Sequence, residues 1–193
     1  MPQPIKRMGG VILAGGASRR MGEDKARMLW DGRRAVDRLA DLLTGLGAAP
    51  ILVSGRDYGL PFVADPAPGA GPVAGLQQTL AALERAGCDA ALVLAVDAPT
   101  LTAEDLAPLI AAGAPGAVYE GLPLPMAVSV AAAPRDLPDD APLKRFIAAA
   151  GLRTLPCPAS AGARIRGANT REERAALLTL RANRGGPLKD EAP

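Results

Sequence analysis

Histidine is absent from this 193-residue chain. Its absence excludes Ser-His-Asp triads, histidine-ligated zinc and a histidine general base. Any catalysis must therefore rest on carboxylates, lysine, arginine, backbone amides or a bound hard metal ion.

Aromatic residues are also scarce, at 3% of the chain, whereas apolar residues make up 49%. The core must therefore be built from alanine, valine, leucine and isoleucine, which suits helices packed on a parallel sheet. A nucleic-acid reader that stacks bases on aromatic rings is disfavoured. The net charge of +2, with acids and bases mixed along the chain, also gives no sign of a nucleic-acid or membrane partner.

Targeting and spanning segments are missing as well. No apolar run is long enough to span a membrane, and residues 1–7 lead into a strand without a signal-peptide pattern. Cys88 and Cys157 lack metal-binding spacing. We expect both to be reduced thiols that serve only as packing residues. We therefore expect a cytoplasmic protein.

The hydrophobic pattern predicts alternating strands and helices. Strands are expected at residues 9–14, 50–53, 60–64, 90–96, 117–119, 126–131 and 153–155. Helices are expected at residues 35–46, 74–86, 102–113, 142–150 and 170–182, the third with a capping box from Thr102 to Asp105. This order predicts a single-domain, Rossmann-like α/β/α sandwich of three layers, with a mostly parallel sheet and an antiparallel strand. The domain is expected to span residues 1–182, followed by a flexible tail at 183–193.

The segment after the first predicted strand carries the strongest functional pattern. It reads LAGGASRRMGEDK, residues 13–25. Its two adjacent glycines allow the backbone to approach a ligand and to turn amides inward. Arg19, Arg20 and Lys25 add cations, and amides combined with cations suit a triphosphate. The spacing fits neither a Walker loop nor GxGxxG, and a solvated turn is the alternative.

Two aspartates follow predicted strands. Ligands of such folds bind at the carboxyl ends of the strands, where Asp65 and Asp97 are expected. Asp97 ends a fully apolar strand, and Mg²⁺ prefers a carboxylate oxygen combined with phosphate oxygens and water. The alternative is that both are turn residues, since Asp65 precedes a proline.

Residues at the starts of two predicted helices are further candidates for ligand binding. Gly71, Pro72 and Gly75 would allow a flat base to lie against the backbone, although they also suit an ordinary helix start. Asn169 precedes the last predicted helix, where it or Thr170 could equally be the N-cap.

The segment at residues 13–25 resembles LAGGxSxRMGxDK, the signature of the molybdenum cofactor guanylyltransferases, within the nucleotidyltransferases of Rossmann-like fold. Weaker similarity extends to about Leu178. The resemblance implies transfer of GMP from GTP to molybdopterin, with Mg²⁺ as cofactor and release of pyrophosphate. It also implies transient contacts with other cofactor-biosynthesis proteins or molybdoenzyme chaperones.

The resemblance assigns roles to particular residues. It implies that Lys25, Asp97 and Arg19 are catalytic, that Asp97 binds the metal, and that Asn169 lies near the acceptor. LAGG, in place of the LAAG of the related cytidylyltransferases, favours GTP over CTP. The nucleotide-binding residues that it implies are Leu13, Ala14, Gly15, Gly16, Lys25, Asp65, Gly71, Pro72, Gly75 and Asp97.

Three departures from the family concern the acceptor side. Ser54-Gly55-Arg56 stands where the family often has an asparagine, Gly167 replaces the first asparagine of N-V-N-T, and Leu124-Pro125 replaces a His-Pro pair. The alternatives are a cytidylyltransferase for the same cofactor, another NTP:phosphate nucleotidyltransferase, or a non-catalytic relative that binds nucleotide or pterin.

Overall fold

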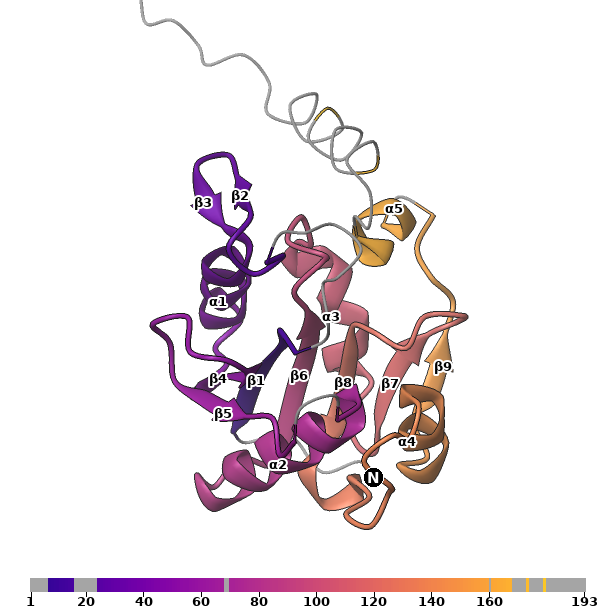
Figure 1. The fold of residues 1–193 in the computed structure, drawn as a ribbon. Helices are drawn as coiled ribbons and strands as arrows, with labels where there is room; N and C mark the ends of the chain where they lie inside the picture. The colour runs from indigo at the N-terminus through magenta and orange to yellow at the C-terminus, as the bar shows by residue number, and fades with distance from the viewer. Residues whose placement is uncertain are drawn as a thin grey trace, which may run out of the picture.

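The computed structural model describes residues 7–15, 24–67, 70–159, 161–167, 173 and 179. Its main sheet has seven strands in the order β5-β4-β1-β6-β8-β7-β9 (Figure 1). The strands are β1 (Met8–Leu13), β4 (Ile51–Gly55), β5 (Phe62–Ala64), β6 (Ala90–Ala95), β7 (Gly116–Tyr119), β8 (Met126–Ser129) and β9 (Arg153–Leu155). A separate two-stranded hairpin consists of β2 (Leu29–Trp30) and β3 (Arg33–Arg34).

The helices cover both faces of the sheet. They are α1 (Ala35–Gly45), α2 (Pro72–Arg85), α3 (Ala103–Ala111), α4 (Leu143–Ala149) and α5 (Gly162–Arg166), with a 3₁₀ turn η1 (Val130–Ala132). One apolar core joins the sheet to α1 and α3, and a second core joins its other face to α2 and α4 (Figure 1). Neighbouring residues of β1 alternate between these cores, because successive side chains of a strand point to opposite faces. The predicted three-layer sandwich is confirmed.

The direction of the strands also matches the prediction. β1 pairs in parallel with β4 and β6, whereas β8 runs antiparallel to both β6 and β7. The sheet is therefore mostly parallel, with one antiparallel strand. The buried central strands β1 and β6 carry small and branched apolar residues, as expected for strands covered on both faces.

The boundaries of the elements differ from the predictions by a few residues. The strand predicted at residues 126–131 ends at Ser129, and the chain continues into η1. The capping box at the start of α3 is confirmed, with Thr102 and Asp105 exchanging side-chain to backbone hydrogen bonds. The helix predicted at 170–182 and the tail at 183–193 fall almost entirely outside the described residues.

The described helices are also too short and too polar to include a candidate membrane span.

Candidate functional site

The carboxyl ends of four parallel strands converge at one edge of the sheet (Figure 1). Leu13, the last residue of β1, lies opposite Ala95 of β6 on one side and Ser54 of β4 on the other. Gly55 of β4 in turn lies opposite Ala64 of β5. The segments that follow these strands are therefore neighbours, although they are distant in sequence. All of the predicted strand-end candidates belong to them.

The carboxylate of Asp65 lies against two of the predicted glycines. A Cβ atom added to Gly15 would lie 2.9 Å from Oδ2 of Asp65, and one added to Gly75 would lie 3.0 Å from Oδ1. A Cβ on Gly75 would also collide with the hydroxyl of the buried Ser54. The structure thus brings Gly15, Asp65 and Gly75 together, and a side chain at either glycine would displace the Asp65 carboxylate or the Ser54 hydroxyl.

The amide of Ala14 has a structural partner. It donates a hydrogen bond of 3.0 Å to the carbonyl of Ser54, while the amide of Val96 donates to the carbonyl of Leu13 at 3.1 Å. These bonds extend the sheet by one residue beyond β1. Ala14 therefore has no spare amide for a triphosphate, and among the described residues the first candidate amide of the loop is that of Gly15. Gly16 and Arg19 lie outside the described residues.

Gly55 is explained by its packing against the loop. Its φ of +128° is unfavourable for residues with a side chain, and an added Cβ would lie 2.8 Å from the amide nitrogen of Gly15. The glycine at this position allows β4 and the loop after β1 to pack together.

The backbone of Asp139 explains why residue 71 is a glycine. Its amide donates to the carbonyl of Asp139 at 3.0 Å, and an added Cβ would lie 2.8 Å from that oxygen. Pro72 then occupies the first turn of α2, where a missing N–H costs no helical hydrogen bond. Contact of Gly71 and Pro72 with a base stays a prediction.

Lys25 and Asp97 come together across the edge of the sheet. Lys25 Nζ lies 3.7 Å from Asp97 Oδ2, and the two side chains are 19% and 30% exposed. Burial raises the pKa of Asp97, while the charge of Lys25 and hydrogen bonds oppose that shift. The pair is open enough to reach a ligand, and a phosphate oxygen or a cation could exchange with either partner. Two predicted catalytic residues thus share one site.

Tyr58 anchors the residue that precedes Lys25. Its hydroxyl donates to the carboxylate of Asp24, with oxygen–oxygen distances of 3.0 and 3.1 Å, and the amide of Ala26 also donates to Asp24 at 3.0 Å. Arg27 lies 3.8 Å from the same carboxylate and stacks over the Tyr58 ring at 5.9 Å. Sequence reasoning missed Tyr58, because its contact with Asp24 crosses 34 residues and carries no local pattern.

Tyr58→Phe tests this anchor. Burial raises the pKa of Tyr58 to about 12, with the negative charge of Asp24 adding to the shift, so the phenol remains a donor at neutral pH. Losing the hydrogen bond is expected to cost about 1 kcal/mol of unfolding free energy, or roughly 2–4 °C of melting temperature.

A raised folded-state pKa stabilises the protein below the unfolded value, and the stabilisation is lost as pH rises through the folded value. The difference in unfolding free energy between wild type and Tyr58→Phe should therefore shrink as pH rises from roughly 10 toward about 12. Urea titrations over that range measure it. A difference that stays constant would contradict the assigned hydrogen bond.

The residue after α5, Gly167, also has a packing role. Gly167 is buried with a φ of +69°, and an added Cβ would collide with the carbonyl of Asp97. The described chain thus returns to the site at this point. The predicted acceptor residue Asn169 lies outside the described residues.

A metal at this edge would rest on few protein ligands. Within the described part of the chain, no three or more Cys, Asp or Glu residues are grouped as for a metal. Mg²⁺ often takes one or two carboxylates and completes its shell with substrate phosphates and water. Asp97, partly exposed beside Lys25, fits that mode of binding.

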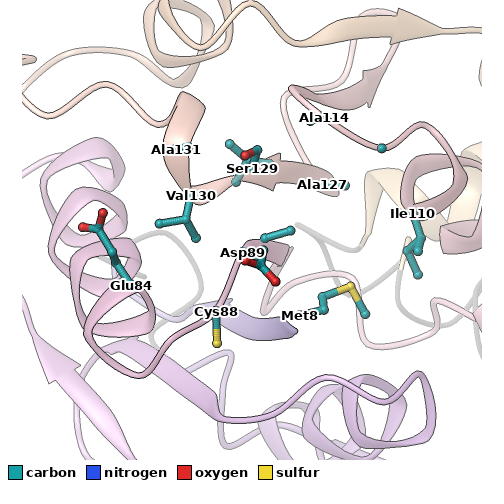
Figure 2. Close-up of a pocket in the computed structure, with 15 residues that line it drawn as sticks. Met8, Glu84, Cys88, Asp89, Ile110, Ala114, Ala127, Ser129, Val130 and Ala131 are labelled. Atoms are coloured by element: carbon teal, nitrogen blue, oxygen red, sulfur yellow. The ribbon is translucent and has the colours of Figure 1, made fainter. Parts of the chain in front are cut away.

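A cavity of about 310 Å³ lies at the opposite edge of the sheet (Figure 2). Met8 and Ala90, the first residues of β1 and β6, line it together with Asp89 and Glu84. Both carboxylates have partners, since Asp89 accepts from the amide of Arg7 and Glu84 pairs with Arg135. Because the cavity lies at the amino ends of β1 and β6 and Asp97 follows the carboxyl end of β6, the cavity is separate from the Lys25–Asp97 pair.

Known proteins resemble this chain in sequence and in fold. The molybdenum cofactor guanylyltransferase of Xanthomonas euvesicatoria pv. vesicatoria is 38% identical over 128 residues, which cover 66% of this chain and 67% of that protein. A probable molybdenum cofactor guanylyltransferase of Opitutus terrae is 40% identical over 102 residues, half of each chain. The alignments thus span about two thirds and one half of these relatives.

A solved structure supports the fold. Molybdopterin-guanine dinucleotide biosynthesis protein A from Archaeoglobus fulgidus superimposes with a TM-score of 0.65 at 17% identity, covering 91% of this chain and all of that one. Residues 10–162 match the family described as the MobA-like NTP transferase domain. This match includes most of β1, the Lys25–Asp97 pair and the glycine cluster around Asp65. The chain therefore belongs to the MobA-like NTP transferase family.

Proposed function

We propose that this chain transfers GMP from GTP to molybdopterin, releasing pyrophosphate and forming the guanine dinucleotide form of the cofactor. The observation that carries the proposal is the Lys25–Asp97 pair beside the cluster of Gly15, Asp65 and Gly75, at the carboxyl edge of the sheet. The family membership and the names of the two curated relatives support it.

The reaction would join two phosphates. A terminal phosphate oxygen of the acceptor attacks the α-phosphorus of GTP, a new P–O bond forms, and the bond to pyrophosphate breaks. Negative charge grows on the transferred phosphoryl group and on the leaving group. The ammonium of Lys25, beside Asp97, would stabilise that charge, and the amide of Gly15 would donate to the triphosphate.

The metal and the attacking phosphate complete the proposed reaction. Asp97 would hold Mg²⁺, which when bound supplies Lewis-acid stabilisation of phosphate charge. A phosphate monoester has a second pKa of about 6 and is largely ionised at neutral pH, so this nucleophile needs no general base. The absence of histidine is compatible with such an acceptor.

A non-catalytic nucleotide or pterin binder is the competing function from another class. Gly55 and Gly167 would favour it, because both stand where the resembling family has polar residues. Each of these glycines lies where a side chain would collide with the backbone of Gly15 or Asp97. Since local packing accounts for both, neither is a sign of a degenerate site.

Base selection is tested by thermal stabilisation with GTP, CTP, UTP and ATP, each with Mg²⁺. At a concentration about 100 times its Kd, GTP should add about 2.7 kcal/mol of stability, which corresponds to a melting shift of roughly 5–10 °C. We expect the other nucleotides to give clearly smaller shifts. A large shift with CTP and none with GTP would contradict the guanylyl assignment.

Measuring turnover distinguishes the proposed enzyme from a non-catalytic binder. We expect pyrophosphate release from GTP to require molybdopterin, and a pyrophosphate-coupled assay measures it. GTP binding without any release in the presence of molybdopterin would favour the binder.

A further inference from the structure

Helix α5 lies beside the start of α3 (Figure 1), and a buried ion pair joins the two helices. The Nε and Nη2 atoms of Arg164 donate to Oδ2 and Oδ1 of Asp105 at 2.8 and 2.5 Å. Asp105 is 3% exposed and Arg164 14%. Each donor bonds a different oxygen of the carboxylate, a paired geometry that lysine cannot reproduce.

Asp105 is itself fixed from several directions. Burial alone would raise its pKa, but hydrogen bonds from Arg164 and from the amide of Thr102 outweigh burial and hold the pKa below its usual range. The Tyr119 hydroxyl donates to the backbone carbonyl of Asp105 at 2.7 Å. Arg164 thus pairs with a carboxylate that several other contacts hold in place.

The residue after α5 contacts the backbone at Asp97, at the carboxyl edge of the sheet. Gly167 packs on the Asp97–Ala98 peptide, and an added Cβ would lie 2.7 Å from the Asp97 carbonyl carbon and 3.1 Å from the amide nitrogen of Ala98. Ile165, between Arg164 and Gly167, is buried in the core. The segment 161–167 therefore bridges Asp105 and the backbone of Asp97.

We propose that Arg164 is a positioning residue for Asp97, acting through Asp105 and Gly167. The ion pair seats α5, the seated helix presses Gly167 against the Asp97–Ala98 peptide, and this contact fixes the direction of the Asp97 carboxylate. The inference rests on the proposed function, in which Asp97 holds the divalent metal. Groups that orient a metal ligand in this way commonly affect metal affinity and turnover.

Two variants test the two ends of this connection. Arg164→Met removes the ion pair, and Gly167→Ala leaves it intact while adding a methyl group against Asp97. Mn²⁺ affinity in the presence of GTP, measured by electron paramagnetic resonance, and kcat should each fall roughly tenfold or more in both variants. Arg164→Lys should give an intermediate loss. GTP affinity in EDTA should stay within about twofold, because Gly15, Asp65 and Gly75 lie on other segments.

Arg166→Met is the matched control, since Arg166 is an exposed arginine of the same helix. It should leave Mn²⁺ affinity and kcat unchanged. The inference is overturned if Gly167→Ala binds Mn²⁺ and turns over like wild type, or if Arg164→Met lowers only the melting temperature. A matching loss of metal-free GTP affinity in both variants would also overturn it, since the damage would then be general.

The metal measurement needs no acceptor. If wild type forms no guanylated product, the proposed function fails, yet the Mn²⁺ affinities still decide the role of Arg164. If wild type binds no Mn²⁺ with GTP, the inference fails whatever the product.

Discussion

Replacing Asp97 with asparagine is expected to lower guanylyl transfer by about a thousandfold or more, which corresponds to roughly 4 kcal/mol of transition-state stabilisation. Asparagine keeps the shape of the side chain but loses its charge. It would therefore be a poor ligand for Mg²⁺ and would leave Lys25, now 3.7 Å from the carboxylate, without that counter-charge. Steady-state pyrophosphate release measures the loss.

The fold should survive this change. Asp97 is 30% exposed and its burial disfavours the charge, so the neutral amide should leave the melting temperature nearly unchanged. Asp136→Asn, at an exposed aspartate far along the chain, is the matched control and should retain full activity. Turnover of Asp97→Asn within tenfold of wild type would remove Asp97 from the mechanism.

Strong local patterns were enough to predict the layers of this fold. The apolar run at residues 90–96 corresponds to β6, and the Thr102–Asp105 spacing marks the start of α3 correctly. Both signals are local, since a buried strand needs continuous apolar residues and a capping box is completed within one helical turn. The positions of Asp65 and Asp97 after strands followed from the same patterns.

Short elements and distant contacts could not be predicted in this way. The strands β2 and β3 have two residues each and α5 has five, too few to establish a period. Sequence alone also placed Ala14 among the residues that bind the nucleotide, whereas its amide donates to the carbonyl of Ser54. That pairing depends on which strand lies beside β1, a property of the whole sheet.

The glycines of the site also show what sequence can predict and what it cannot. A Gly-Gly pair after a strand predicts close approach of something to the backbone. The structure identifies the neighbour of Gly15 as the carboxylate of Asp65, and that of Gly167 as the carbonyl of Asp97. Neither neighbour is local in sequence, so the need for glycine could be predicted at Gly15 but its physical cause could not.

Replacing Lys25 with methionine is expected to lower kcat about a hundredfold or more, since the site loses the described cation closest to Asp97. Methionine retains most of the length of the side chain and fills similar space. The fall should be larger in kcat than in GTP affinity, because the charge on the leaving group grows during the reaction. Single-turnover measurements with saturating GTP separate the two effects.

Stability should respond far less than catalysis to this substitution. An ion pair at 3.7 Å between partly exposed groups contributes about 0–1 kcal/mol, so the melting temperature should move by roughly 4 °C or less. Lys144→Met, at an exposed lysine of α4, should match wild type in both measurements. Lys25→Arg keeps the charge but changes its shape and reach, so partial recovery of kcat would show that charge alone is insufficient. Full activity in Lys25→Met would contradict the proposed electrostatic role and leave Lys25 as a structural partner of Asp97.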